Sequence, residues 1–128
     1  MKFARLATIF LATVSFMDAE VYELRTYYTL PGKLPDLHNR FKNHTMRLLE
    51  KHGMKNIGYW QPQDEPGKSN MLIYILKHKS REAAKASWDA FRADPEWVKA
   101  RTESEKGGKI MDRVESVFMD AVPYSPMK

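Results

Sequence analysis

The sequence predicts one α+β domain with the element order β-α-β-β-α-β, preceded by a short apolar leader. The spacing of apolar residues changes from steps of two to steps of three and four at Pro31-Gly32, which indicates a strand followed by a helix. A second helical pattern begins at Ser80 after another apolar run. A chain of 128 residues has room for one domain of this kind.

The first half of the domain is predicted to form a strand, a helix and a second strand. Residues 20–30 (EVYELRTYYTL) are rich in β-branched and aromatic side chains and end at the turn signal. Apolar residues then recur at helical steps from Lys33 onward, and Gly53 after His52 suits a left-handed helix cap. Residues 56–61 (NIGYWQ) form the second strand, which ends before a proline.

The third strand and the second helix follow a loop at residues 64–69. Residues 71–76 (MLIYIL) are a continuous apolar run without alternation, which predicts a strand that is buried on both faces. Ser80 starts the next helix. We expect four positions of this helix to face the core, namely Ala83, Ala86 or Ser87, Ala90 and Phe91.

The second helical region is predicted to break near Ala93 and to restart. Asp94 is a typical N-cap residue, and Pro95 fits the first position of a new helix. Gly107-Gly108 ends this helix. Residues 113–122 (RVESVFMDAV) alternate as the last strand, and prolines follow in the tail.

This order is the ferredoxin-like plan of two split β-α-β units. Right-handed crossovers place both helical regions on one face of a four-stranded antiparallel sheet. The third strand directs apolar side chains toward both faces, so the helix-free face would carry an exposed apolar patch of the kind that usually marks an interface. We therefore expect a homodimer in which two sheets pack face to face through their helix-free sides.

Composition excludes several classes of site. The absence of cysteine excludes disulfides, zinc–thiolate sites and thiol nucleophiles. The formal charge of +5 is modest, and the basic residues are scattered among acids. A nucleic-acid-binding protein usually gathers them in a stripe, so we interpret the excess as a solvated surface and expect no nucleic-acid partner.

Residues 1–19 differ from the rest of the chain. Lys2 and Arg5 precede an uncharged run from Leu6 to Met17. This run is too short to cross a hydrocarbon core of about 30 Å as a helix, but it has the length of the apolar segment of a secretory signal. We expect residues 1–19 to be a signal peptide of an exported protein, and no membrane span in the mature chain.

Three alternatives to this leader stay open. The residue at Met17 is larger than is usual near a cleavage site, and an earlier cleavage signal is present at Thr13-Val14-Ser15. A mitochondrial presequence would also be basic and free of acids, although it is usually richer in arginine and more amphipathic. The third alternative is that residues 1–19 form a helix of the fold itself.

A series of short motifs runs through residues 20–128. They are Val21-Tyr-Glu-Leu-Arg-Thr-Tyr27, Pro31-Gly32-Lys33, His44-Thr45, Lys51-His-Gly-Met54, Gly58-Tyr-Trp60, Ser80-Arg-Glu-Ala83, Phe91-Arg-Ala-Asp-Pro-Glu-Trp97, Val114-Glu-Ser-Val-Phe118 and Ser125-Pro126. In this order they resemble the NIPSNAP family over nearly the whole of residues 20–128. Gly107-Gly108-Lys109 departs from the Gly-Pro-like turn that would be more typical.

The resemblance implies a dimeric α/β-barrel, in agreement with the sheet-to-sheet dimer. It implies little about chemistry, because bacterial members are mostly uncharacterised and eukaryotic members are described as mitochondrial proteins with binding and signalling roles. Monooxygenases, isomerases and haem-handling enzymes share the barrel, but a fold does not fix a function.

Five residues are candidates for a ligand pocket: Arg25, Tyr27, His44, Trp60 and Tyr74. Arg25 and Tyr27 share one face of a central strand with Glu23, where a charge is costly to bury unless it is paired. This pattern indicates either an Arg25–Glu23 ion pair or a site for a small anion or polar ligand.

The other candidates also have two interpretations. His44 lies at the edge of the apolar stripe of the first helix, where it suits general acid–base chemistry or a bonded, partly buried histidine. Trp60 and Tyr74 would line an aromatic pocket or belong to the core.

The remaining polar residues give no site pattern. His52 is explained by the end of a helix, and His38 and His78 are predicted to lie on the surface. The histidines lack metal-binding spacing, so we expect neither a metal nor a cofactor. A nucleophile-elbow context is absent around Ser69, Ser87 and Ser116, and Gly67-Lys-Ser69 lacks a phosphate-binding loop.

Two hypotheses of function remain. The first is a non-catalytic homodimeric module that binds a small hydrophobic or aromatic molecule or another protein. The second is a small cofactor-free oxygenase or isomerase for an aromatic or polyketide-like compound, in which Arg25 holds an enolate or carboxylate and His44 moves a proton. A ligand-sized pocket reached by both side chains would favour the enzyme.

Overall fold

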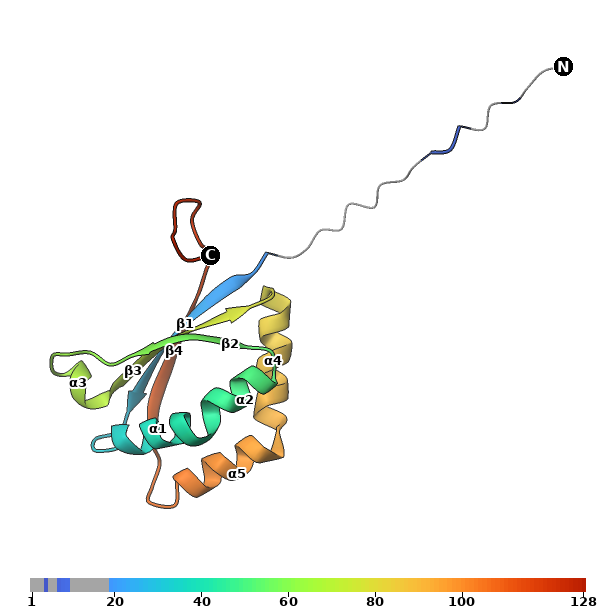
Figure 1. The fold of residues 1–128 in the computed structure, drawn as a ribbon. Coiled ribbons are helices and arrows are strands. Elements are labelled where there is room, and N and C mark those ends of the chain that lie inside the picture. The colour runs from blue at the N-terminus through green and yellow to red at the C-terminus, as the bar shows by residue number, and fades with distance from the viewer. Residues whose placement is uncertain (1–3, 5–6, 10–18) are drawn as a thin grey trace.

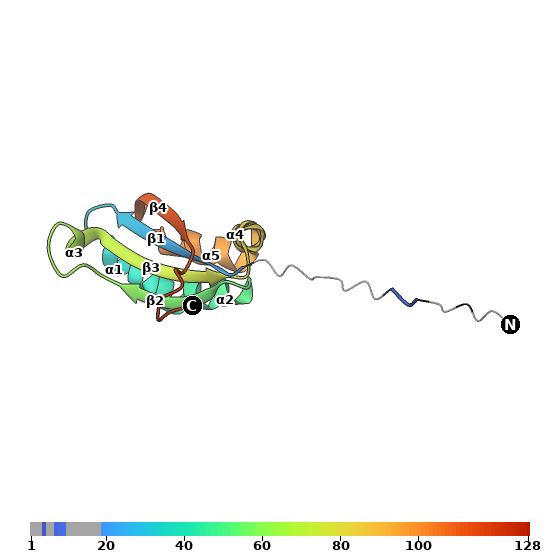
Figure 2. The ribbon, with the colours of Figure 1, turned by 90° about the horizontal axis from the view of Figure 1, so that it is seen from above.

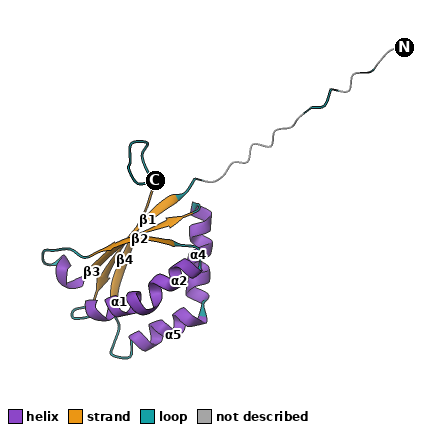
Figure 3. Cartoon of the chain, viewed as in Figure 1, coloured by secondary structure: helices purple, strands orange, loops and turns teal. Residues whose placement is uncertain are grey.

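The computed structural model describes residues 4, 7–9 and 19–128 (Figure 1). Most of the expected signal peptide, residues 1–3, 5–6 and 10–18, therefore lies outside the described residues. The domain itself begins with a strand at Val21 and alternates strands and helices from there (Figure 3). None of the helices in the described part of the chain is long and apolar enough to cross a membrane.

The elements follow the predicted order. The strands are β1 (Val21–Thr29), β2 (Lys55–Trp60), β3 (Met71–His78) and β4 (Met111–Met119). The helices are α1 (Leu34–Arg40), the π-helix η1 (Phe41–Thr45), α2 (Met46–Lys51), α3 (Gly67–Asn70), α4 (Arg81–Ala93) and α5 (Pro95–Ser104). The short α3 lies where the sequence predicted only a loop.

The four strands form one antiparallel sheet in the order β2-β3-β1-β4. This is the ferredoxin-like arrangement, and it confirms the predicted fold class. Helices α1, α2, α4 and α5 lie on one side of the sheet (Figures 1 and 3). Because β1 lies between β3 and β4, Arg25 is paired with Tyr74 on one side and with Ser116 on the other. Directly paired residues point to the same face, so these three side chains share the helix side.

The core lies between the sheet and the helices. Seven side chains of this core have no exposed surface, namely Leu37, Leu48, Leu49, Met54, Tyr74, Leu76 and Ile110. In β3 the helix-facing residues are buried, whereas Met71, Ile73 and Ile75 are only partly buried. Strand β3 is thus fully covered on one face, and the prediction of burial on both faces does not hold within a single chain.

The first helical region contains a turn that the periodicity did not predict. The sequence predicted one helix from Lys33 to His52, but residues 41–45 adopt a π-helix in which the Met46 N–H donates to the Phe41 carbonyl, five residues back. Phe41 and Thr45 point into the core on either side of this turn. Gly53 has the left-handed conformation (φ 83°) that was predicted for the helix cap.

The second helical region breaks where the sequence predicted. The hydroxyl of Ser80 accepts the Ala83 N–H at 3.0 Å, and the carboxylate of Asp94 accepts the Glu96 N–H at 2.9 Å. The predicted core face of α4 is wrong in part, because Ala86 and Ala90 are exposed. Ala84, Trp88 and Phe91 are buried instead. Trp88 has the largest apolar surface in α4, and burying it sets the rotation of the helix.

Strand β4 ends earlier than predicted, and the tail turns back. The sequence predicted a strand at residues 113–122, but pairing ends at Met119. Residues 120–128 cross the sheet on its helix-free side (Figure 2). Tyr22 faces that side and is only 7% exposed, because the tail covers it.

Candidate functional site

The helix-free face of the sheet carries a band of apolar side chains beside the charged Arg113 and Glu115, and it is incompletely covered. Strand register places Leu24, Ile73, Ile75 and Val117 on this face. Val117 is 54% exposed, and the neighbouring edge strand β2 adds Trp60 at 50%. Apolar side chains on two central and two edge strands therefore form one patch, which we call the open face.

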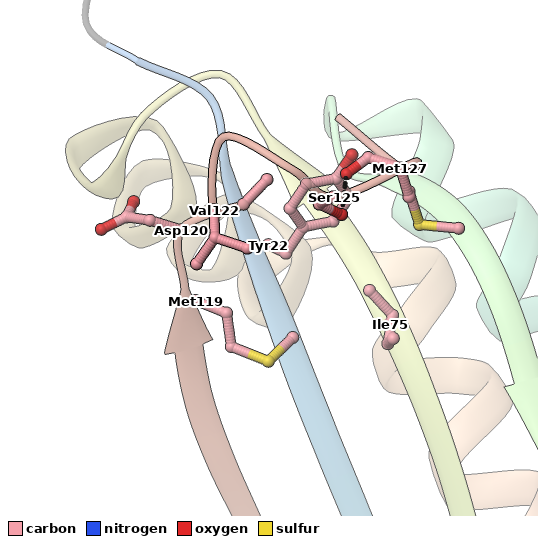
Figure 4. Close-up of a pocket in the computed structure, with 8 residues that line it drawn as sticks. Tyr22, Ile75, Met119, Asp120, Val122, Ser125 and Met127 are labelled. Carbon is pink, nitrogen blue, oxygen red and sulfur yellow. Dashed lines mark hydrogen bonds between the residues drawn. The ribbon is translucent and has the colours of Figure 1, made fainter.

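An apolar pocket of about 250 Å³ lies where the tail crosses the open face (Figure 4). The sheet contributes Tyr22, Ile75 and Met119, and the tail contributes Val122 and Met127 among others. The tail is attached by few polar contacts, such as that of the Lys77 ammonium with the Lys128 carbonyl at 3.2 Å. The pocket is therefore lined mainly by apolar groups of both the sheet and the tail, and neither of the two closes it fully.

On the opposite, helix-covered side, a buried carboxylate organises a polar network. Oε1 of Glu23 lies 2.8 Å from both Trp88 Nε1 and His78 Nε2. Oε2 accepts from Ser116 Oγ at 2.6 Å and from Arg25 Nη1 at 2.8 Å. Burial of Glu23 opposes ionisation, but these hydrogen bonds outweigh it and lower the pKa of the carboxyl to about 2. Glu23 is therefore ionised at neutral pH with four donors around it.

Arg25 is held in one orientation by this network. Its Nε donates to the Tyr74 hydroxyl at 3.1 Å, and its Nη2 lies 3.4 Å from the Tyr27 hydroxyl. The guanidinium carbon lies 4.2 Å from the centre of the Trp88 ring, a cation–π contact. Although burial disfavours the charge, the two tyrosines and Glu23 raise the pKa of Arg25 above its ordinary value. The predicted Arg25–Glu23 ion pair is present.

The tyrosines form a short chain of hydroxyls. Tyr74 accepts from Arg25 and donates to Tyr27 at 2.9 Å. Tyr74 is fully buried, and burial raises its pKa well above the ordinary value, so the phenol stays neutral. Its ring stacks on Tyr59 at 5.0 Å between centroids. The chain of hydroxyls thus runs from the buried Tyr74 to the half-buried Tyr27.

The structure brings together three of the five candidate pocket residues. Arg25, Tyr27 and Tyr74 are hydrogen-bonded to one another on the helix side. Trp60 belongs to the edge strand β2, where it is paired with Ile73 and also lines an edge pocket with Phe41 and Tyr59.

His44 lies in a groove between η1 and α5, with Arg40, Asn43 and Ser104 among the lining residues. None of the residues that contact Arg25 lines this groove. The structure therefore does not join His44 to the Arg25 network.

The sequence did not predict three members of the network, namely His78, Ser116 and Trp88. His78 was predicted to lie on the surface, but it is 2% exposed and bonded to Glu23. A signal for this was the two-residue period of a strand, which puts His78 on the same face as Leu72, Tyr74 and Leu76 if the strand continues past the apolar run. Ser116 and Trp88 had no local signal for their role, because they meet Glu23 across more than sixty residues of chain.

The chemistry that this network can perform is limited by its connectivity. Glu23 lies between Ser116 and His78, whereas a nucleophilic triad requires the histidine between acid and serine. Ser116 donates its proton to a carboxylate and is not activated by His78. Within residues 19–128 and the few described residues before them, no three histidine, aspartate or glutamate side chains are grouped to hold a metal ion. The network is suited to holding Arg25, not to nucleophilic catalysis.

His52 has a structural explanation. Its Nε2 lies 2.7 Å from Asp94 Oδ2, and the Lys51 ammonium donates to the same oxygen at 2.8 Å. These contacts, with the Glu96 N–H, lower the pKa of Asp94. The cluster joins the end of α2 to the start of α5.

Comparison with known proteins gives one family. The family model described as NIPSNAP matches residues 22–126. A protein of Dictyostelium discoideum described as a NipSnap homolog is 27% identical over 109 residues, which is 85% of this chain. The chain spans 40% of the length of that relative.

Solved structures agree on the fold. A NIPSNAP-family protein of unknown function from Agrobacterium tumefaciens has a TM-score of 0.71 at 21% identity, covering 86% of this chain and 95% of its own. SnoaB from Streptomyces nogalater, a cofactor-independent oxygenase, has a TM-score of 0.56 at 12% identity, covering 84% and 98%. At these identities the similarity concerns the fold alone.

Proposed function

The chain belongs to the NIPSNAP family, and we propose that it is a homodimeric binding module in which two open faces pack together and enclose a small hydrophobic or aromatic ligand. The observation that carries this proposal is the open face itself. It presents exposed apolar side chains on the two edge strands and partly buried ones on the two central strands, and it contains an apolar pocket.

The energetics of the open face support the dimer. Val117 and Trp60 leave about half of their surface in water, and burying apolar area contributes about 25 cal/mol per Å². A monomeric protein rarely exposes a contiguous patch of this kind. A twofold axis would bring the same patch of a second copy against it, which is the isologous contact that homodimers use.

The pocket on the open face supports the choice of ligand. Its volume of about 250 Å³ is just below the range usual for small-molecule sites. A second sheet packed on this face would enclose it further. Because its lining is mostly methionine, valine, isoleucine and tyrosine, it fits an apolar or aromatic group.

The oligomeric state tests the dimer. Ile73→Asp puts a charge in the middle of the open face, where Ile73 is only partly buried in one chain, and should convert a dimer into a monomer in light scattering at micromolar concentration. Val98→Asp is the matched control, because Val98 is 51% exposed on α5. A monomeric wild type, or equal behaviour of the two variants, would contradict the proposal.

The ligand is tested with N-phenyl-1-naphthylamine, an uncharged aromatic probe. Its fluorescence should rise on binding to the wild-type dimer. Val122→Asp places a charge in the tail side of the pocket and should abolish the rise, and light scattering of the same variant separates loss of the pocket from loss of the dimer. If the fluorescence of the probe rose as much with Val122→Asp as with the wild type, the ligand would bind outside this pocket.

The second candidate is a small cofactor-free oxygenase or isomerase for an aromatic or polyketide-like compound. It is favoured by the oriented Arg25 and by a fold shared with SnoaB. His44 is an unsuitable proton carrier for a ligand on Arg25, because its groove shares no residue with the Arg25 network. Dioxygen uptake with anthrone as probe, lost in Arg25→Lys, would place this function first.

We also propose that residues 1–19 are removed on export. Cleavage before Glu20 would leave β1, which begins at Val21, intact. The intact mass of the protein purified from its own cells tests this, since it distinguishes removal of 19 residues from an unprocessed chain. A mature mass found only in a mitochondrial fraction would favour the presequence instead.

A further inference from the structure

Arg40 is a buried guanidinium with few partners. Its side chain is 4% exposed and lies where α5 packs along α1 and η1 (Figure 1). A guanidinium carries five N–H groups, but among the described residues only Nη1 makes a hydrogen bond, to the Ser104 hydroxyl at 3.3 Å. The Glu105 carboxylate lies 3.6 Å from the same nitrogen. Burial lowers the pKa of Arg40, although an arginine stays charged at neutral pH.

The other two nitrogens of Arg40 differ in their access to solvent. Nε is buried and has no hydrogen-bond partner. Nη2 also has no acceptor within the part of the chain that the structure describes. It is not one of the buried atoms that lack a partner, so it keeps contact with solvent. Because Arg40 lines the groove of about 330 Å³ between η1 and α5, Nη2 is the donor that this groove offers at its floor.

His44 is a second polar group without a partner in the same groove. It belongs to the π-turn, a feature that occurs often at functional sites. Its half-buried ring makes no hydrogen bond to any described residue, and neither ring nitrogen is sealed from solvent. Arg40 and His44 are four residues apart, so they share one side of the helical region. The groove therefore holds two donors that no acceptor of the described chain satisfies.

The opposite wall of the groove carries an unpaired acid. Glu103 lines the groove from α5, is exposed, and belongs to no ion pair among the described residues. The other acid of the groove, Asp36, is 3.8 Å from the Lys33 ammonium. Two carboxylates and one guanidinium thus line the groove, so a simple anion such as phosphate gains nothing from the overall charge.

From these contacts we propose that the groove binds a small zwitterion, a free amino acid. Its carboxylate accepts from Arg40 Nη2 and from the His44 imidazole, and its ammonium group pairs with Glu103. The exposed amides of Asn39 and Asn43 also line the groove and suit a polar side chain on the ligand. The groove lies on the helix side of the sheet, so this site is separate from the open face and independent of the dimer.

The test uses L-serine as probe, with two counterparts that each lack one of its charges. The first, 3-hydroxypropanoate, lacks the ammonium group, and the second, ethanolamine, lacks the carboxylate. The chain has four histidines, so the ring-proton NMR signal of His44 can be assigned by its loss in His44→Gln. Serine should shift this signal saturably, with a dissociation constant on the order of 1 mM. Each counterpart should bind about ten-fold more weakly or worse, because it leaves one charged group of the groove unpaired.

Variants separate the site from general binding. Glu103→Gln removes the partner of the ammonium group, and Arg40→Lys removes the planar fork. Each should weaken serine about five-fold or more, the loss of one hydrogen bond to a charged group. Glu82→Gln is the matched control, because Glu82 is an exposed glutamate on α4 outside the groove, and it should leave the constant unchanged. Glu103 is exposed and makes no hydrogen bond within the described residues, so Glu103→Gln decides the outcome if Arg40→Lys does not fold.

Three results would overturn the site. They are a shift that does not saturate with serine, equal binding of serine and 3-hydroxypropanoate, and the same constant in Glu103→Gln as in the wild type. The monomer variant Ile73→Asp should bind serine as the wild type does. Loss of the dimer without loss of serine binding therefore separates failure of the proposed homodimer from failure of this inference.

Discussion

Glu23→Gln is the substitution that tests the buried network most directly. One of the two carboxylate oxygens becomes an NH₂ group, so two donors that now face an acceptor would face another donor. The pKa of Glu23 falls from 4.5 to about 2 in the folded protein, which corresponds to about 3 kcal/mol of stabilisation at pH 7. Leaving Arg25 without its partner gives a similar figure, about 3–5 kcal/mol for a broken buried pair.

The expected loss at pH 7 is therefore about 3 kcal/mol, or about 10–20 °C in melting temperature for a domain of this size. Urea unfolding followed by tryptophan fluorescence measures it, at one protein concentration for all variants. Glu115→Gln is the matched control, because Glu115 lies on β4 with a 57% exposed side chain. It should change the free energy of unfolding little.

The pH dependence gives a second check on the same residue. The folded pKa of Glu23 lies below its unfolded value, so its stabilisation is complete above about pH 5 and is lost as the pH falls toward 2. Glu23→Gln has no such group, so the gap to the wild type should narrow between pH 5 and pH 2. A variant as stable as the wild type at pH 7, or a gap that stays constant with pH, would refute the assignment of Glu23 as the centre of the network.

Three further substitutions probe the local structure, each measured by urea unfolding. Ser80→Ala removes the acceptor of the Ala83 N–H and should cost about 1 kcal/mol. Gly53→Ala forces a side chain into a left-handed conformation and should cost about 1–2 kcal/mol; no loss would mean that the cap relaxes. Leu48→Ala empties a fully buried position and should cost about 2–5 kcal/mol, whereas Met46→Ala, already 37% exposed, should cost far less.

Local patterns predicted the order of the elements well. The helix break at Asp94 and the cap at Gly53 depend on residues next to one another, and both are present as predicted. The rotation of α4 was less predictable, because Trp88 and not the alanines decides which side is buried. The π-turn at residues 41–45 has no proline or glycine to announce it.

The candidate site was predictable only in its first strand. Glu23, Arg25 and Tyr27 share a face because side chains alternate along β1, and this can be seen without a structure. Their partners His78, Trp88 and Ser116 come from three other elements, and only tertiary pairing brings them to Glu23. His44 and Trp60 were grouped with Arg25 by chemistry alone, and the fold puts them elsewhere.

The π-turn also determines where the chain can change its length. A π-turn holds one residue more than the α-turn it replaces, so deleting one residue among 41–45 would let α1 continue into α2 without rotating either. A deletion elsewhere in these helices would turn everything after it by about 100° and pull Leu48 and Leu49 out of the core. Lys42 and Asn43 are exposed, so their loss removes no buried contact. A chain one residue shorter at this point can therefore keep the same domain.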